Sequence, residues 1–130
     1  GEGATKFITV NVSGGKSESE CKNVAFAVAE SPLVKTALFA ADANWGRVLA
    51  AVGRAIDSDT SIEDIDIKFG EYSIVANGLP VAHDEDKLND LLLLPEIEIN
   101  IVLGRSQAEV TVWSCDLSYD YVRINAEYRS

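Results

Sequence analysis

Alternation of apolar and polar residues, or enrichment in β-branched residues, predicts β-strands in five parts of the chain. These parts are residues 7–12, 64–69, 72–76, 97–103 and 107–115. Gly70-Glu71 provides a two-residue hairpin turn between the second and third strands. Gly104-Arg105-Ser106 turns the chain ahead of the last strand, which is therefore predicted as a returning strand.

Apolar residues at helical spacing predict three helices. Ser17-x-x-Glu20 is a capping box that opens the first helix, and Pro32 closes it. The second helix begins near Asn44, and the third covers residues 84–94, with acids in its first turn. Residues 33–39 are ambiguous between helix and strand. The first two helices have apolar stripes, formed by Cys21, Val24, Ala25 and Val28 and by Trp45, Val48, Leu49, Val52 and Ile56.

The order of these elements predicts an α+β fold. It reads β-α-α-β-β-α-β-β, and an irregular tail follows at residues 116–130. Such an order is typical of a mostly antiparallel mixed sheet with helices on one face. The length and the 47% apolar share are enough for one domain with a real core, at residues 1–130.

The charge balance excludes some classes of partner. The chain has 21 acids against 11 bases, a net charge of −10 that would repel nucleic acid. Residues 57–90 hold ten of the acids and two of the bases, which we interpret as a solvated face. The longest apolar run, residues 91–94, is far too short for a membrane span.

Two features of composition bear on the origin of the chain. It contains no methionine and begins with Gly1, so we expect it to be a piece of a longer product. Cys21 and Cys115 lie in mostly apolar settings. Although two cysteines can form one bridge, this setting favours reduced, buried thiols in a cytoplasmic protein.

Most familiar chemical motifs fail on inspection. His83 is the only histidine, and its loop setting favours an exposed residue over a catalytic one. Asp57–Ser61 begins like a calcium loop, but the required glycine and glutamate are replaced by Ile62 and Lys68. No cluster has the spacing of a metal site, so we expect neither metal nor cofactor.

Three segments are unusual without being decisive. In Gly1–Lys6, glycines flank Glu2, which lets the backbone approach a ligand while the acid meets a cation; a solvated turn is the alternative. Asp42–Arg47 is interpreted as a helix start with Trp45 in the core. The tail interleaves tyrosines with Arg123, Asn125 and Arg129, as a docked terminal arm would.

Four blocks carry a family resemblance that spans residues 1–130. They are GEGATKF, SPLVKTAL, NWGRVLAAVGRA and CDLSYDYVRINAEYRS. In this order they resemble the β chain of the ornithine acetyltransferase (glutamate N-acetyltransferase) family of arginine biosynthesis. The resemblance implies the carboxyl-terminal part of that β chain, within a larger DmpA/ornithine-acetyltransferase-like (Ntn-hydrolase-like) enzyme.

The resemblance also implies an activity. Family members are precursors that cut themselves into α and β chains, and the new amino-terminal threonine of the β chain becomes the nucleophile. It carries acetyl from N-acetylornithine to glutamate; some members use acetyl-CoA as well. The threonine is not in this chain, because Thr5 belongs to the downstream GEGATKF block. We therefore expect no catalytic residue here and no activity from this piece alone.

Three residues match substrate-binding positions of the family: Glu2, Asn125 and Ser130. Residues 1–6 and 117–130 are thus expected to reach the active site. The implied partners are the α chain and the rest of the β chain in an α2β2 heterotetramer, with ornithine among the small molecules bound and no nucleic acid or membrane. The alternative is a non-catalytic acidic α+β interaction module.

Overall fold

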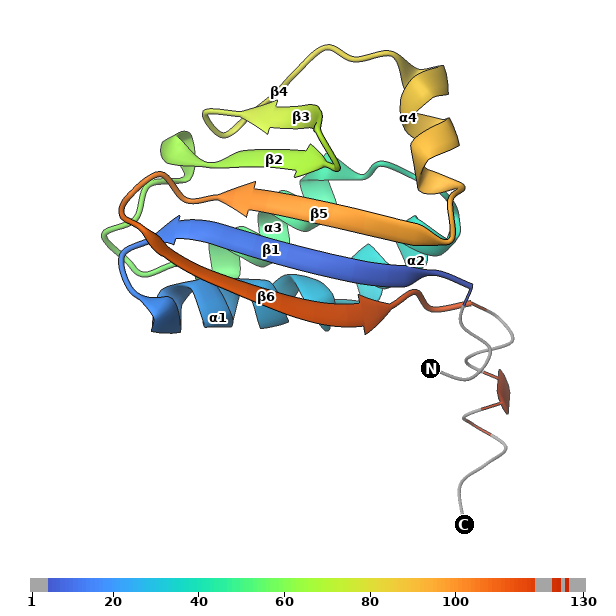
Figure 1. Ribbon diagram of the computed structural model, residues 1–130, viewed down its shortest axis with the longest axis horizontal. Coiled ribbons are helices and arrows are strands. Elements are labelled where there is room, and N and C mark those ends of the chain that lie inside the picture. Colours follow the sequence, from blue (N-terminus) through green and yellow to red (C-terminus); the bar gives the residue numbers. More distant parts are fainter. Residues whose placement is uncertain (1–4, 119–122, 125, 127–130) are drawn as a thin grey trace.

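A six-stranded sheet forms the centre of the computed structural model, which describes residues 5–118, 123–124 and 126 (Figure 1). Its strand order is β4-β3-β2-β5-β1-β6, and β1 and β5 form its one parallel pair in the described part of the chain. The strands are β1 (Phe7–Gly15), β2 (Asp66–Phe69), β3 (Tyr72–Ala76), β4 (Leu79–Pro80), β5 (Glu96–Val102) and β6 (Ala108–Cys115). The predicted mostly antiparallel mixed sheet is confirmed.

The helices confirm the predicted α+β class. They are α1 (Glu18–Ala29), α2 (Pro32–Phe39), α3 (Trp45–Ala55) and α4 (Glu85–Leu92), with a 3-10 turn, η1, at Ile62–Asp64. In Figure 1, α1, α2 and α3 lie behind the sheet, and α4 stands at the end where β5 begins. Among the described residues, no helix is long and apolar enough to cross a membrane.

Local chemistry settles the ambiguity at residues 33–39. The Ser31 side chain accepts a hydrogen bond from the Val34 N–H, and Pro32 occupies the first turn, where its missing N–H costs nothing. A helix cap therefore starts α2 at Pro32, three residues after α1 ends at Ala29. The last strand does not pair with the strand that precedes it. Instead, β6 passes β5 and pairs antiparallel with β1 at the edge of the sheet.

The core lies between the sheet and the helices that cover it. The inward side chains of β1, β2 and β5 meet the predicted apolar face of α1 and most of that of α3. Burying such side chains stabilises the fold by about 1.5–3 kcal/mol each. The buried set includes Ile8, Val10, Val12, Cys21, Val24, Val28, Val48, Val52, Ile67, Phe69, Ile99 and Ile101.

The other face of the sheet is not covered by any helix of the described chain. Its centre carries a polar ladder, in which Asn11 Nδ2 donates to Asn100 Oδ1 at 2.8 Å and the Thr111 hydroxyl donates to Asn11 Oδ1 at 2.7 Å. Beside this ladder, Phe7 is 50% exposed and Trp113 is 63% exposed. Large aromatic side chains in the open are typical of a surface that meets other protein.

The two cysteines are free thiols. Cys21 is buried, as predicted, and burial raises the pKa of its thiol. Cys115 is only half-buried, because it lies at the end of edge strand β6. The predicted buried setting is therefore wrong for Cys115.

Candidate functional site

The two ends of the described fold meet beside the first residue of β1. Phe7 pairs with Cys115 across β1 and β6, so Lys6, which precedes β1, lies beside Asp116, which follows β6. The Asp116 N–H donates to the Lys6 carbonyl at 3.4 Å, which extends the pairing by one step. Sheet register thus brings the end of residues 1–6, at Thr5 and Lys6, next to the start of the tail.

The Asp116 side chain holds this junction together. Its Oδ1 accepts from the Thr5 N–H at 2.8 Å and from the Lys6 N–H at 3.0 Å, and its Oδ2 accepts from the Thr5 hydroxyl. Asp116 is fully buried, at 0% exposure. A buried carboxylate is costly unless its oxygens are hydrogen-bonded, and here three donors satisfy it.

Lys6 extends the junction to α2. Its buried ammonium group donates to the carbonyls of Leu38 and, at 3.5 Å, Phe39. These carbonyls lie at the carboxyl end of α2, where the helix dipole favours a cation. Burial lowers the pKa of Lys6, and the charge of Asp116 opposes this shift. On the tail side, the Leu117 N–H donates to the Lys35 carbonyl at 3.4 Å.

The three predicted substrate-binding residues, Glu2, Asn125 and Ser130, lie outside the described residues. The structure does describe neighbouring parts of the chain. Thr5 and Lys6, which come after Glu2, end the first segment. Asp116, Leu117 and Ser118, which come before Asn125 and Ser130, begin the tail. Sequence reasoning missed Lys6 and Asp116. Their only signal was membership of the GEGATKF and CDLSYDY blocks, since nothing in an isolated aspartate shows that it will be buried.

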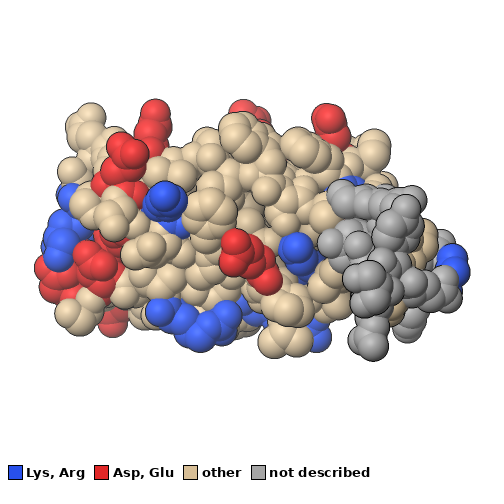
Figure 2. Space-filling model, turned by 90° about the horizontal axis from the view of Figure 1, so that it is seen from below, with Lys and Arg blue, Asp and Glu red and all other residues tan. Residues whose placement is uncertain are grey.

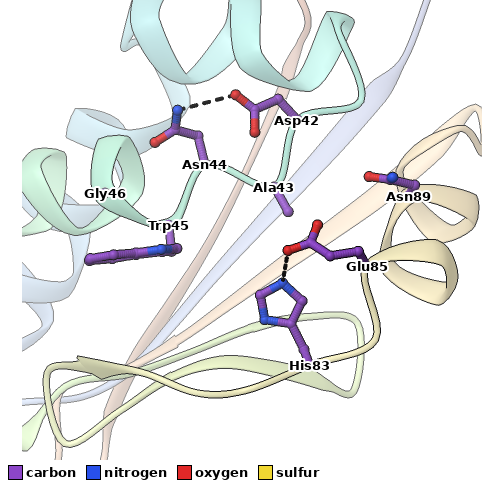
Figure 3. Close-up of a pocket in the computed structure, with 8 residues that line it drawn as sticks. All are labelled: Asp42, Ala43, Asn44, Trp45, Gly46, His83, Glu85 and Asn89. Atoms are coloured by element: carbon purple, nitrogen blue, oxygen red, sulfur yellow. Dashed lines mark hydrogen bonds and ion pairs between the residues drawn. The ribbon is translucent and has the colours of Figure 1, made fainter.

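A second site is a pocket of about 370 Å³ at the start of α3 (Figure 3). Its lining includes Asp42, Trp45, His83, Glu85 and Asn89. Several of its polar groups bind one another: Asn44 Nδ2 donates to Asp42 at 3.2 Å, and His83 Nε2 lies 3.0 Å from Glu85 Oε1. The pocket is therefore open and polar, with much of its hydrogen-bonding capacity used internally.

This pocket corrects two predictions. Trp45 is 37% exposed and lines the pocket, so its interpretation as a core tryptophan is wrong; the residue precedes the buried stripe of α3 by most of a turn. The prediction that His83 is exposed is also wrong, because its side chain is only 14% exposed. Its ring lies between the Val81 carbonyl and Glu85, and it meets Tyr72 edge-to-face at 6.4 Å.

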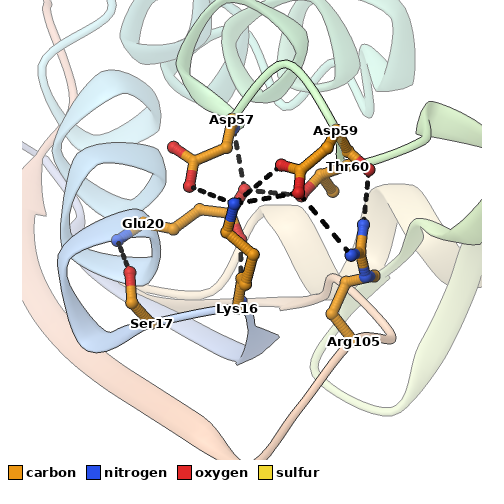
Figure 4. Close-up of polar contacts among 7 residues, drawn as sticks. All are labelled: Lys16, Ser17, Glu20, Asp57, Asp59, Thr60 and Arg105. Carbon is orange, nitrogen blue, oxygen red and sulfur yellow. Dashed lines mark hydrogen bonds and ion pairs between the residues drawn. The ribbon is translucent and has the colours of Figure 1, made fainter.

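A third polar cluster lies at the other end of β1 (Figure 4). Glu20 is 1% exposed, and its carboxylate accepts from the N–H groups of Lys16 and Asp57, each at 2.8 Å, and from the Thr60 hydroxyl at 2.7 Å. Burial raises the pKa of Glu20, but these hydrogen bonds and the Lys16 charge leave it below its ordinary value. The cluster joins the start of α1 to the loop after α3.

Charge on the surface follows the prediction of a solvated acidic stretch. Eight of the ten acids in residues 57–90 are exposed. Asp59 pairs with the Lys16 ammonium at 2.8 Å. Figure 2 shows one face of the molecule, on which acidic and basic side chains lie close together. Within the described residues, no group of three or more His, Cys, Asp or Glu side chains is arranged to hold a metal ion.

Comparison with known proteins gives these features a family context. A family model described as "ArgJ family" matches residues 1–130, the whole chain. The chain belongs to the ArgJ family. The resemblance inferred from the four sequence blocks is therefore confirmed.

Curated ArgJ relatives match along the entire chain. The arginine biosynthesis bifunctional protein ArgJ of Psychrobacter arcticus is 56% identical over 131 residues, and that of Pseudomonas fluorescens is 51% identical over the same length. Both alignments cover 100% of this chain but only 32% of the relative, so the chain spans about a third of their length.

A solved ArgJ structure supports the fold. The crystal structure of the arginine biosynthesis bifunctional protein ArgJ from Bacillus halodurans matches with a TM-score of 0.92 and 40% sequence identity. The match covers 98% of this chain and 60% of the solved chain. The ArgJ-like, Ntn-hydrolase-like fold that the family resemblance implied is thus confirmed.

Proposed function

We propose that this chain is the part of an ArgJ-type glutamate N-acetyltransferase that carries its carboxyl-terminal substrate contacts. The observation that carries the proposal is the whole-chain match to proteins named arginine biosynthesis bifunctional protein ArgJ. In the reaction, a threonine hydroxyl outside this chain attacks the acetyl carbonyl of N-acetylornithine and ornithine leaves. The amine of glutamate then attacks the acetyl-enzyme, which restores the hydroxyl and gives N-acetylglutamate.

The chain's share of this chemistry is substrate binding. Glu2 would meet an ammonium group of the substrate, while Asn125 and Ser130 would hydrogen-bond to its polar groups. The junction at Asp116 supports this assignment, because it holds together the two segments on which these residues lie. The reaction needs no metal or cofactor, and acetyl-CoA would serve as a second acetyl donor.

The remaining two-thirds of the protein supplies the nucleophile and the chain's partners. We infer that the α chain and the rest of the β chain pack against this fold in a cytoplasmic α2β2 heterotetramer. The exposed Phe7 and Trp113 support this inference, because they form an aromatic surface on the uncovered face of the sheet. Isolated from its partners, the piece would be inactive.

Intact mass of the purified whole protein tests the proposal against a non-catalytic interaction module. We expect two chains, of which the second begins at an internal threonine and becomes one acetyl group heavier when N-acetylornithine is added without glutamate. A single uncut chain that gains no mass would overturn the proposal and favour the module.

A further inference from the structure

We propose that Asp116 is a positioning residue for substrate binding: it ties Thr5 and Lys6, which follow Glu2 in the chain, to the start of the tail to which Asn125 and Ser130 belong. The inference rests on the proposed function and adds a residue to it. Asp116 itself is not a catalytic residue, because its carboxylate is buried and fully occupied by Thr5 and Lys6.

The geometry at Asp116 fixes Thr5 and Lys6, the two residues that lead into β1. One carboxylate oxygen accepts two consecutive backbone N–H groups, at 2.8 Å and 3.0 Å, and the other accepts the Thr5 hydroxyl. Both the backbone and the side chain of Thr5 are therefore held. Glu2 lies three residues away, within about 11 Å of extended chain. Because so few residues separate them, we expect a displacement of Thr5 to change the positions that Glu2 can reach.

The same residue fixes the start of the tail. The Asp116 N–H donates to the Lys6 carbonyl at 3.4 Å, so its backbone binds Lys6 while its side chain binds both Thr5 and Lys6. The Leu117 N–H reaches the Lys35 carbonyl of α2 at 3.4 Å, and Lys6 reaches the carboxyl end of that helix. Residues 5–6, 35–39 and 116–117 therefore form one connected unit.

The buried charge points to a role beyond closing the edge of the sheet. A carboxylate at 0% exposure pays a desolvation cost that an apolar residue at the end of a strand would avoid. What an apolar residue lacks is the ability to fix two N–H groups and a hydroxyl at once. Misplacement of a substrate-binding group by about 1 Å is enough to weaken an enzyme by up to about 100-fold.

The test uses steady-state kinetics of the whole, self-processed protein with N-acetylornithine and glutamate. Asp116→Asn replaces one acceptor oxygen by a donor, and Thr5→Val removes only the hydroxyl bond. Glu20→Gln is the matched control, because Glu20 is also a buried, fully hydrogen-bonded carboxylate. It lies at the other end of β1, about 30 Å away at 3.3 Å per residue.

We expect Asp116→Asn to raise KM about tenfold while kcat changes less than about twofold, the pattern of lost uniform binding. Thr5→Val should raise KM by a smaller factor. Glu20→Gln should lower the Tm as much as Asp116→Asn does and leave KM unchanged. Equal KM values in wild type and Asp116→Asn would overturn the inference and leave Asp116 as a structural residue.

Two further outcomes distinguish a failure of the variant to fold, a failure of the inference and a failure of the proposed function. If Asp116→Asn does not fold, Thr5→Val decides: a raised KM supports the inference, and an unchanged KM overturns it. If the processed wild-type protein transfers no acetyl group, the proposed function fails and the inference falls with it.

Discussion

The Glu20 carboxylate accepts a hydrogen bond from the Thr60 hydroxyl at 2.7 Å, across 40 residues of sequence. It also accepts from the N–H groups of Lys16 and Asp57. One buried side chain therefore closes the amino end of α1 and fixes the loop after α3. Glu20 therefore stabilises both the start of its own helix and the packing of that helix against a distant loop.

Replacing this carboxylate should destabilise the protein in a pH-dependent way. Glu20→Gln puts an amide NH2 where an oxygen now accepts, at a cost of about 1–3 kcal/mol in the free energy of unfolding. Because folding lowers the pKa of Glu20, its stabilisation is present above the ordinary pKa and is lost as the pH falls through the folded value. Urea unfolding at neutral pH and below pH 4.5 measures both effects.

The control is Lys16→Met, which keeps the Lys16 N–H bonded to Glu20 and removes only an exposed ammonium group. We expect a much smaller loss of stability from this change. Equal losses in the two variants, or an unaltered acid profile in Glu20→Gln, would contradict the account.

Helix and strand positions follow closely from the sequence because their signals are local. The Ser17 cap and the alternation at Ile65, Ile67 and Phe69 each need only a few residues. Pairing is not local, and nothing in residues 104–115 indicates that β6 passes β5 to reach β1. Similarly, the five predicted strands do not include β4, the two-residue strand that pairs with β3 after Asn77-Gly78.

The site was less predictable than the fold. Periodicity alone placed Trp45 in the core, but a residue in the first turn lies at the end of the buried stripe and faces a pocket. Asp116 and Lys6 give no signal in isolation, because their burial depends on contacts across 110 residues. The family resemblance supplied Glu2, Asn125 and Ser130, which chemical patterns alone did not identify.

Trp113 should lie in an interface of the whole protein. Trp113→Asp places a charge on the uncovered sheet face, and burying that charge would oppose assembly. We expect less assembled protein by size-exclusion chromatography with light scattering. Trp45→Asp makes the same chemical change at a tryptophan on the helical side and should assemble normally. Equal assembly of both variants would show that the sheet face is free.

Glu2→Gln should weaken catalysis without unfolding the protein. Loss of the charge that meets the substrate ammonium is expected to cost about 1–3 kcal/mol, or roughly 5- to 150-fold in kcat/KM. Glu18→Gln is the control, since Glu18 is an exposed acid in the first turn of α1. An unchanged kcat/KM in Glu2→Gln would remove Glu2 from the site.

The end of the chain should also be sensitive. If Ser130 binds substrate, an ordered extension after it will block the site, and deletion of residues 126–130 will raise KM or abolish turnover. The same extension placed on the α chain's amino end should be harmless. Full activity with the carboxyl-terminal extension would contradict the role of Ser130.

The most direct test of the central claim follows the acetyl group itself. The whole protein, purified and self-processed, is mixed with N-acetylornithine that carries a ¹³C-labelled acetyl group and with unlabelled glutamate. We predict labelled N-acetylglutamate and ornithine in equal amounts, by NMR. A folded, fully processed protein that produces neither would contradict the claim that this chain belongs to an acetyltransferase of this kind.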